Sequence, residues 1–162
     1  MFKSRKEVKD LGLTLLEVLL SLVITGIIAS IVLTFYISQY RLVNQVMTKT
    51  ELNYSLLRAG QVLTSAVKIG EKVEWTGKVL RISYYQGEKA FLDTYYLADK
   101  DLDGISDLYR EHLAVPNPVA SGVTFFNCIE LNKGFWEISL RAGEGVDEVY
   151  WERKVKQKLC ID

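Results

Sequence analysis

Apolar residues run almost without interruption from position 13 to position 37. This segment of 25 residues contains one charged residue, Glu17, and no proline. A helix of that length is about 37 Å long, which is enough to cross a lipid bilayer. Apolar residues keep helical spacing from Gln39 onwards, and Gly70 is a typical stop signal. The pattern therefore predicts one helix over residues 13–69.

Two apolar stripes follow the second half of this predicted helix. A helix over 13–69 is about 85 Å long, too long to be buried within its own domain. We expect the first stripe to meet other subunits and the second to pack on a head domain, although one broad amphipathic face covering a single core is an alternative. The first stripe is Val43, Val46, Met47, Thr50, Tyr54 and Leu57, and the second is Leu52, Leu56, Ala59, Leu63 and Ala66.

The hydrophobic period changes to two after Gly70, which predicts strands. The turns Gln86–Lys89 and Asn132–Gly134 predict two hairpins. Pro116 and Pro118 place residues 114–122 in a connection. The expected strands are Val79–Tyr85, Ala90–Ala98, Val123–Leu131, Phe135–Arg141 and Glu148–Leu159.

One long helix followed by consecutive strands predicts an α+β fold, with an antiparallel sheet. The expected organisation is a membrane helix over 13–38, its amphipathic continuation over 39–69, and a head over 70–162. Aromatic residues concentrate in the late strands and suggest the core of a meander: Phe125, Phe126, Phe135, Trp136, Tyr150 and Trp151.

Charge is distributed unevenly, although the 162 residues carry no net charge. Basic residues dominate positions 1–12, which carry a charge of +2, so the remainder carries −2. Such residues resist translocation, which predicts a cytoplasmic N-terminus and an extracytoplasmic head. Taken alone, the apolar run and its charges fit a plain signal anchor that is retained whole, because no cleavage site follows the run.

Glu17 is the exception within the apolar segment. A carboxylate at this depth costs about 3 kcal/mol in a bilayer, and such residues usually have a function. Residues 13–40 supply no cation to pair with it. Cleavage after Gly12 would create an α-amino group at Leu13, which could pair with Glu17 of a neighbouring molecule.

The residues around Gly12 carry a family resemblance. Gly12 through Val18, after a short basic leader, resembles the prepilin signal of type IV pilins and type II secretion pseudopilins. The resemblance covers residues 1–40. It implies a pilin fold, with 1–12 as a leader that prepilin peptidase removes, methylation of the new N-terminus at Leu13, and assembly through Glu17.

Two positions depart from the usual family pattern. Leu13 replaces the common phenylalanine, and Thr34 stands where major pilins commonly have a kinking proline. The second departure favours a minor pilin or pseudopilin, most similar to minor pilins of the PilW type or minor pseudopilins of the J type. The resemblance then implies storage in the inner membrane and assembly with other pilins into a filament that this subunit primes or caps.

Residues 99–107 have the spacing of a calcium loop. Asp99, Asp101, Asp103 and Asp107 occupy positions one, three, five and nine, with Gly104 at six. Hard oxygen ligands suit Ca²⁺, and the backbone carbonyl of Ile105 can join them. Arg110 at position twelve excludes a standard EF-hand. The loop resembles the nine-residue DxDxDGxxD loops of extracellular calcium-binding proteins, and a solvated acidic turn is the alternative.

Two cysteines, Cys128 and Cys160, lie in different predicted strands. A disulfide would close a loop of about 33 residues and stabilise the head by about 3–4 kcal/mol. Two buried free thiols are the alternative, and an extracytoplasmic head favours the disulfide.

Other functional classes have weaker support. Lys154, Lys156 and Lys158 alternate, but an ordinary charged edge strand explains them better than DNA binding does. His112 is the only histidine, and no catalytic constellation is present, so we do not expect an enzyme. The main alternative is a membrane-anchored, calcium-dependent binding module that does not polymerise.

Overall fold

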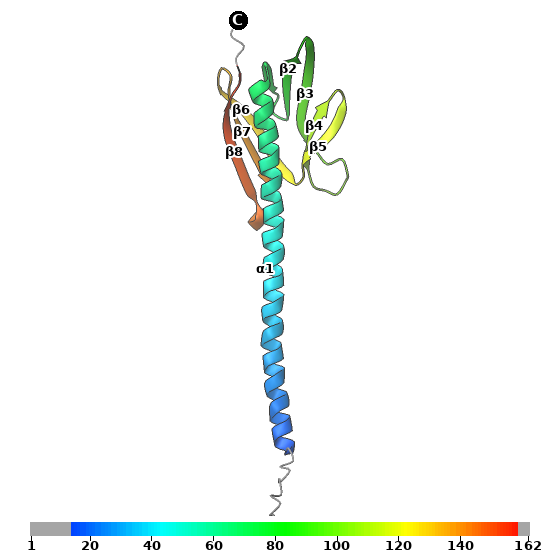
Figure 1. Ribbon diagram of the computed structural model, residues 1–162, viewed down its shortest axis with the longest axis vertical. Coiled ribbons are helices and arrows are strands. Elements are labelled where there is room, and N and C mark those ends of the chain that lie inside the picture. Colours follow the sequence, from blue (N-terminus) through cyan, green and yellow to red (C-terminus); the bar gives the residue numbers. More distant parts are fainter. Residues whose placement is uncertain (1–13, 159–162) are drawn as a thin grey trace, which may run out of the picture. The chain divides into compact units, whose positions relative to one another are not determined.

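A computed structural model describes residues 14–158, as one long helix followed by two antiparallel sheets (Figure 1). The chain divides into two units, Met1–Asn44 and Gln45–Asp162. The fold class is α+β, as predicted.

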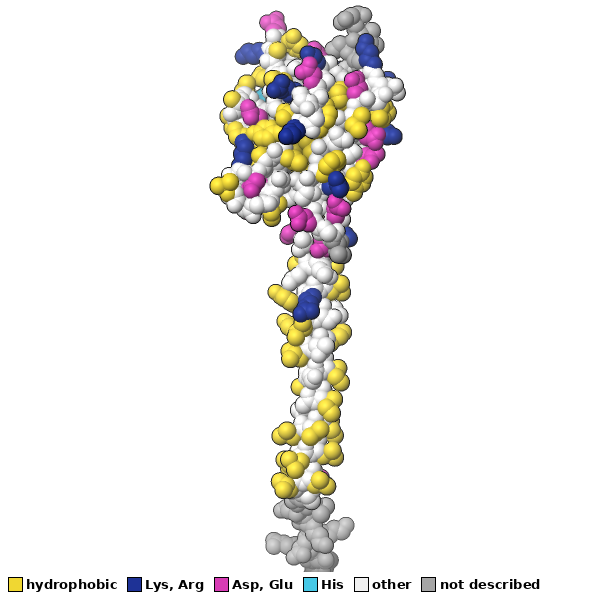
Figure 2. All heavy atoms as spheres, turned by 180° about the vertical axis from the view of Figure 1, so that it is seen from behind, with side chains coloured by type: hydrophobic (Ala, Val, Ile, Leu, Met, Phe, Trp, Pro, Cys, Tyr) yellow, Lys and Arg dark blue, Asp and Glu magenta, His cyan; other side chains and the backbone are white. Residues whose placement is uncertain are grey.

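Helix α1 covers Leu15–Ile69. It ends where glycine was expected to stop it, and the Gly70 N–H bonds the Ala66 carbonyl at 2.9 Å. In the first unit α1 is long and apolar enough to span a membrane. Figure 2 shows apolar side chains along this part of the helix, and those of Leu15, Ile24 and Phe35 are exposed.

Within residues 14–158, eight strands form the two sheets, and consecutive strands are neighbours within each sheet. The five-stranded sheet contains β1 (Lys72–Trp75), β2 (Val79–Gln86), β3 (Lys89–Ala98), β4 (Asp107–His112) and β5 (Val115–Ala120). The three-stranded sheet contains β6 (Val123–Asn132), β7 (Phe135–Ala142) and β8 (Val149–Lys156), with the short 3₁₀ helix η1 (Gly145–Asp147) before β8.

Both predicted hairpins are confirmed, at β2–β3 and at β6–β7. The expected connection over 114–122 is wrong in most of its length, because residues 115–120 form β5. Strand β5 lies at a sheet edge. Pro116 and Pro118 are tolerated there because the outward side of an edge strand has no neighbouring strand that needs an N–H donor. Strands β1 and β4 were also missed, since both are too short to show their period.

The head core lies between α1 and the two sheets. The second predicted stripe of α1 supplies the helix side of this core, as expected, and every residue of the first stripe is exposed. The core includes Leu56, Ala59, Leu63 and Val67 of α1, Leu80, Ile82, Tyr95 and Leu108 of the first sheet, and Phe126, Trp136, Ile138 and Leu140 of the second. Burial of each of these leucine side chains stabilises the folded head by about 2 kcal/mol.

The aromatic residues of the late strands divide between the two faces of their sheet. Phe126 and Trp136 are buried, and Trp151 packs against the core from β8. Tyr150 is exposed. The predicted meander is therefore present, but only three of the six aromatic side chains belong to or pack against the core.

The end of the described chain is tied to the end of α1. The Lys158 N–H bonds the Lys68 carbonyl at 3.1 Å, which satisfies one free carbonyl of the last helical turn. The Gln157 side-chain amide donates to the Glu71 carbonyl at 2.6 Å and its oxygen accepts from Trp136 Nε1 at 3.3 Å. These bonds join the end of β8 to the start of β1.

Candidate functional site

The start of α1 forms a capping box. Thr14 precedes the first helical residue, and its Oγ1 accepts the Glu17 N–H at 3.3 Å. Glu17 Oε2 in turn accepts the Thr14 N–H at 2.8 Å and its hydroxyl at 3.0 Å. This reciprocal pattern satisfies donors that a helix start leaves free. Glu17 therefore has a local partner that sequence reasoning missed, although a Thr three residues before a Glu is the signal for it.

The hydroxyl groups of the apolar segment are also satisfied locally. Ser21, Thr25 and Thr34 each donate to the carbonyl four residues earlier, at 2.8, 2.7 and 2.9 Å. Such bonds let hydroxyl groups lie in an apolar surrounding without losing a hydrogen bond. Gly12 and Leu13, the predicted cleavage and methylation positions, lie outside the described residues.

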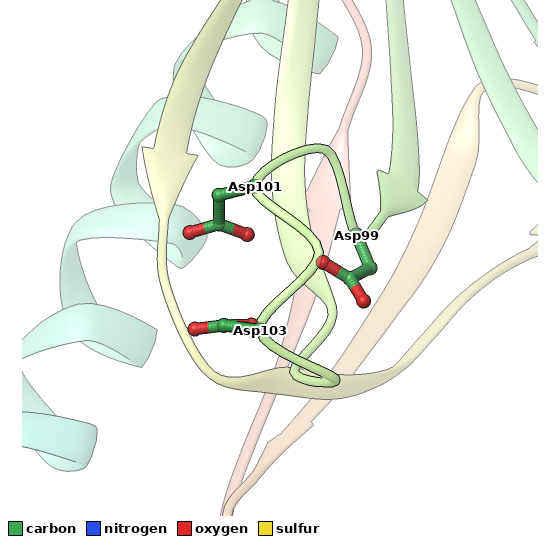
Figure 3. Close-up of side chains that lie close together, drawn as sticks. All are labelled: Asp99, Asp101 and Asp103. Atoms are coloured by element: carbon green, nitrogen blue, oxygen red, sulfur yellow. The ribbon is translucent and has the colours of Figure 1, made fainter.

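Three carboxylates converge in the loop between β3 and β4 (Figure 3). Asp99, Asp101 and Asp103 each offer an oxygen that lies within 4.8 Å of the other two, so this group could hold a metal ion. Asp99 Oδ2 accepts the Gly104 N–H at 3.0 Å, whereas its Oδ1 is buried and has no hydrogen-bond partner among the described residues. An orphaned carboxylate oxygen next to two further carboxylates is the arrangement that a hard cation would satisfy.

Backbone geometry turns the loop at two positions. Gly104 has φ +85°, which glycine adopts without strain, and Leu102 has φ +60°. The Ile105 N–H bonds Asp103 Oδ1 at 2.8 Å, which holds the Asp103 side chain against the turn. Ile105 thus contacts the cluster through its N–H.

Asp107 is not among the converging carboxylates. It is the first residue of β4, it is buried, and its Oδ1 accepts the Gly122 N–H at 3.0 Å. This bond fastens the β5–β6 link to the start of β4. The sequence predicts Asp107 as a metal ligand from its spacing, and this assignment stays a prediction; in the structure one oxygen of its carboxylate bonds the backbone of the β5–β6 link.

The loop carboxylates influence one another electrostatically. A backbone hydrogen bond within Asp101 favours its charged form, but desolvation, the charge of Asp103 and the hydrogen bond with Asp99 together raise the pKa of Asp101. A cation at this position would remove the repulsion. Lys100 turns away from the carboxylates and lies over the rings of Tyr96 and Tyr109, with Nζ 2.9 Å from the Tyr96 hydroxyl.

Cys128 is fully buried on β6, and burial raises the pKa of its thiol to about 12. Cys160 lies outside the described residues, so the predicted disulfide stays a prediction.

The predicted basic face of β8 is mixed, because Glu137 lies 4.0 Å from Lys154 and Glu152 lies on the same strand.

One polar cluster within the head was missed. Asp93 on β3 is buried, and its Oδ2 accepts Arg110 Nη2 at 2.7 Å and Nε at 3.0 Å. Its Oδ1 lies 2.7 Å from His112 Nδ1. The signal in the sequence is a single acidic residue within a strand of mostly apolar and aromatic residues. Its partners could not be inferred, because β4 was not predicted.

Comparisons of the chain with protein families, with curated proteins and with solved structures each found no match.

Proposed function

We propose that this chain is a filament subunit of the type IV pilin and type II secretion pseudopilin class, and a minor member of it. Prepilin peptidase would cleave after Gly12, and the new N-terminus at Leu13 would be methylated. The subunit would then leave the inner membrane and enter a filament with other pilins or pseudopilins, near its tip.

The observation that carries this proposal is one acidic residue in an apolar helix. Glu17 lies two residues from the start of α1, and no apolar side chain of the described helix up to Met47 is buried. Such a surface requires either lipid or other helices around it. In a filament, neighbouring helices cover the apolar surface and a neighbouring α-amino group neutralises Glu17, so one arrangement explains both features.

The proposed topology follows from charge and length. The basic residues before Leu13 stay in the cytoplasm, the first half of α1 crosses the inner membrane, and the head lies outside. A head that folds outside the cytoplasm can use calcium and can form a disulfide.

Cleavage is tested by co-expressing the full chain with a prepilin peptidase. We expect intact-mass measurement to show loss of residues 1–12 and one added methyl group on Leu13. A Gly12→Val variant is the matched control and should remain uncleaved. Retention of Met1 in the wild-type chain would overturn the proposal.

The role of Glu17 is tested by two substitutions. The Glu17→Gln variant retains a side chain that can complete the capping box but removes the charge. The Glu17→Ala variant removes both. We expect both variants to insert in the membrane and neither to enter filaments. If Glu17→Gln assembles as well as the wild type, Glu17 acts only as a helix cap.

We further propose that the loop over Asp99–Asp107 binds Ca²⁺ through Asp99, Asp101 and Asp103, and that the ion is structural. The converging carboxylates and the orphaned Asp99 oxygen support this assignment. The same loop favours one other candidate function, a membrane-anchored calcium-dependent binding module. An uncleaved N-terminus together with calcium binding would select that alternative.

A further inference from the structure

A cavity lies between α1 and the β4–β5 side of the five-stranded sheet, and its volume is about 290 Å³. Helix α1 lines it with Arg58 and Val62, β4 lines it with Arg110 and His112, and β5 lines it with residues 117–119. Pockets for drug-sized ligands begin at about 300 Å³. The cavity therefore has room for a small organic group.

The two walls of this cavity are held at a fixed spacing. On α1 the neighbouring residues Ala59 and Leu63 are fully buried in the core, so the helix is packed against the sheet here. The Ser55 hydroxyl also donates to the carbonyl of Ser121, the residue after β5, at 2.8 Å. The cavity is therefore formed before any ligand binds, as ligand sites usually are.

The polar side of the cavity carries excess positive charge. Arg110 uses its Nε and one Nη2 hydrogen for Asp93, at 3.0 and 2.7 Å, so its remaining N–H groups are available to a ligand. Arg58 makes no ion pair with any described residue, and no acidic side chain lines the cavity. Two guanidinium groups and one carboxylate leave a net charge of +1 when His112 is neutral. One carboxylate from a ligand would balance this charge.

The rest of the lining is largely apolar. Val62 packs against the core, Val119 is buried, and Pro118 completes this side from β5. A guanidinium group binds a carboxylate through two parallel hydrogen bonds. An inorganic anion would leave the apolar side without a contact, so the lining fits a carboxylate attached to an apolar group better.

His112 lies in the wall of the cavity in a fixed orientation. Its Nδ1 is 2.7 Å from Asp93 Oδ1, and its ring stacks on Phe91 with the ring centroids 5.6 Å apart. It is also the only histidine in the chain. Its ring signals therefore report on this cavity alone.

We propose that this cavity binds an organic carboxylate, whose charged end lies between Arg58 and Arg110 and whose apolar part contacts Val62 and Val119. The carboxylate belongs either to a free small molecule or to a glutamate side chain of another protein. Cavities of about 590 and 370 Å³ adjoin this one along α1 and share Arg58 and Arg110 with it, respectively. A peptide could extend into them, whereas a small molecule would occupy only the central cavity. The site does not depend on the proposed filament role.

The first test titrates the purified full chain in detergent with benzoate at constant ionic strength, with a ¹³C label in the histidine ring. We expect the His112 ring signals to shift and to saturate as one site. Benzamide is the matched neutral probe, and we expect it to bind at least about tenfold more weakly, because it lacks the charge that the guanidinium groups recognise. Equal binding of benzamide, or a shift that does not saturate, would overturn the proposal.

The second test removes the unpaired guanidinium group. Arg58→Met keeps an apolar stem at an exposed position of α1, and we expect it to weaken benzoate binding at least about tenfold. Arg81→Met is the matched control. Arg81 lies between the buried residues Leu80 and Ile82 and so faces away from the cavity. Benzoate binding that Arg58→Met leaves unchanged would overturn the site.

A third titration distinguishes the two sources of the carboxylate. The probe is the tripeptide acetyl-Leu-Glu-Leu-amide, whose apolar neighbours can reach the adjoining cavities. Tighter binding of this peptide than of benzoate would support the carboxylate site and identify a protein ligand. Tighter binding of benzoate would support the same site and identify a small molecule. Absence of saturable binding for both probes would overturn the proposal.

Discussion

At the scale of single residues, Gly60 allows the second sheet to approach α1. A Cβ atom built at this position would lie 2.3 Å from the Trp151 ring, and contacts under 3.0 Å require a shift. Trp151 is a large side chain that packs against the core. The absence of a side chain at Gly60 is therefore a packing requirement, although glycine normally weakens a helix.

We predict that Gly60→Ala destabilises the head by about 1–3 kcal/mol, as overpacking does. The gain in helix propensity of about 1 kcal/mol is too small to compensate. Thermal unfolding of the full chain, followed by near-ultraviolet circular dichroism, measures the change. Gln61→Ala, at the exposed neighbouring position, is the matched control. A rise in melting temperature for Gly60→Ala would contradict the predicted contact.

Loss of Arg110 and loss of the Asp93 charge should destabilise the head by different amounts. Its side chain is 3 % exposed, whereas that of Arg110 is 38 % exposed. Arg110→Met leaves a buried carboxylate with only His112 beside it, and we expect a loss of about 2–4 kcal/mol. Asp93→Asn leaves a guanidinium that can reach water, and we expect a smaller loss of about 1–2 kcal/mol.

The same unfolding measurement compares these two variants. Arg81→Met, on an exposed position of β2, is the control for loss of an arginine. Equal losses for Arg110→Met and Asp93→Asn would show that burial of the carboxylate does not dominate the energetics of this cluster.

At the scale of elements, the β4–β5 hairpin turns through two residues with unusual backbone conformations. Leu113 has φ +51° and Ala114 has φ +62°. A two-residue turn of this kind usually contains asparagine and glycine, because left-handed backbone strains other residues. The absence of these residues explains why the hairpin was not predicted.

We predict that Ala114→Gly stabilises the head by about 0.5–1 kcal/mol, because glycine removes the backbone strain at this turn. Ala90→Gly, which places the same change within β3, is the control and should destabilise it. Thermal unfolding again provides the readout. A lower melting temperature for Ala114→Gly would be inconsistent with the turn geometry.

In the loop between β3 and β4, calcium binding and stabilisation of the loop backbone can be tested separately. If Ca²⁺ is present at 100 times its dissociation constant, the head gains about 2.7 kcal/mol of stability. We expect Asp103→Asn to abolish most of the difference in melting temperature between Ca²⁺ and EDTA. Asp107→Asn should lower the melting temperature in both conditions, because it weakens the bond to Gly122.

Glu88→Gln is the matched control for this loop, since it removes an exposed acidic charge from the β2–β3 turn. It should leave the calcium response unchanged. A wild-type chain without any difference between Ca²⁺ and EDTA would show that the acidic cluster is a solvated turn.

At the scale of the whole molecule, the core and the apolar helix are separable. The unit that begins at Gln45 contains every buried core residue of the described chain, and the first of these on α1 is Leu56. We predict that residues 45–162 alone form a water-soluble, folded head. The full chain should require detergent, because the apolar side chains before Asn44 are exposed.

Sedimentation and circular dichroism of both chains measure this difference. A chain of residues 55–162 serves as the comparison, since it starts only one residue before Leu56, removes Leu52, which packs against the core, and should be less stable. Aggregation of residues 45–162 in the absence of detergent would contradict the division into two units.

The sequence by itself determined the features that repeat at short range. An apolar run without proline predicts a long helix, and period two between glycine-containing turns predicts β2, β3, β6 and β7, because these patterns depend on neighbours a few residues apart. Convergence of Asp99, Asp101 and Asp103 was predictable for the same reason, since all three lie in one loop.

Only the tertiary structure decided the pairings between distant residues. Strand β4 pairs with β3 on one side and with β5 on the other. This pairing gives Asp93 its partners and brings the Asp107 carboxylate to the Gly122 N–H. Gly60 faces Trp151 only because the second sheet closes on α1. These contacts join residues that are distant in the sequence, so the spacing of neighbouring residues does not predict them.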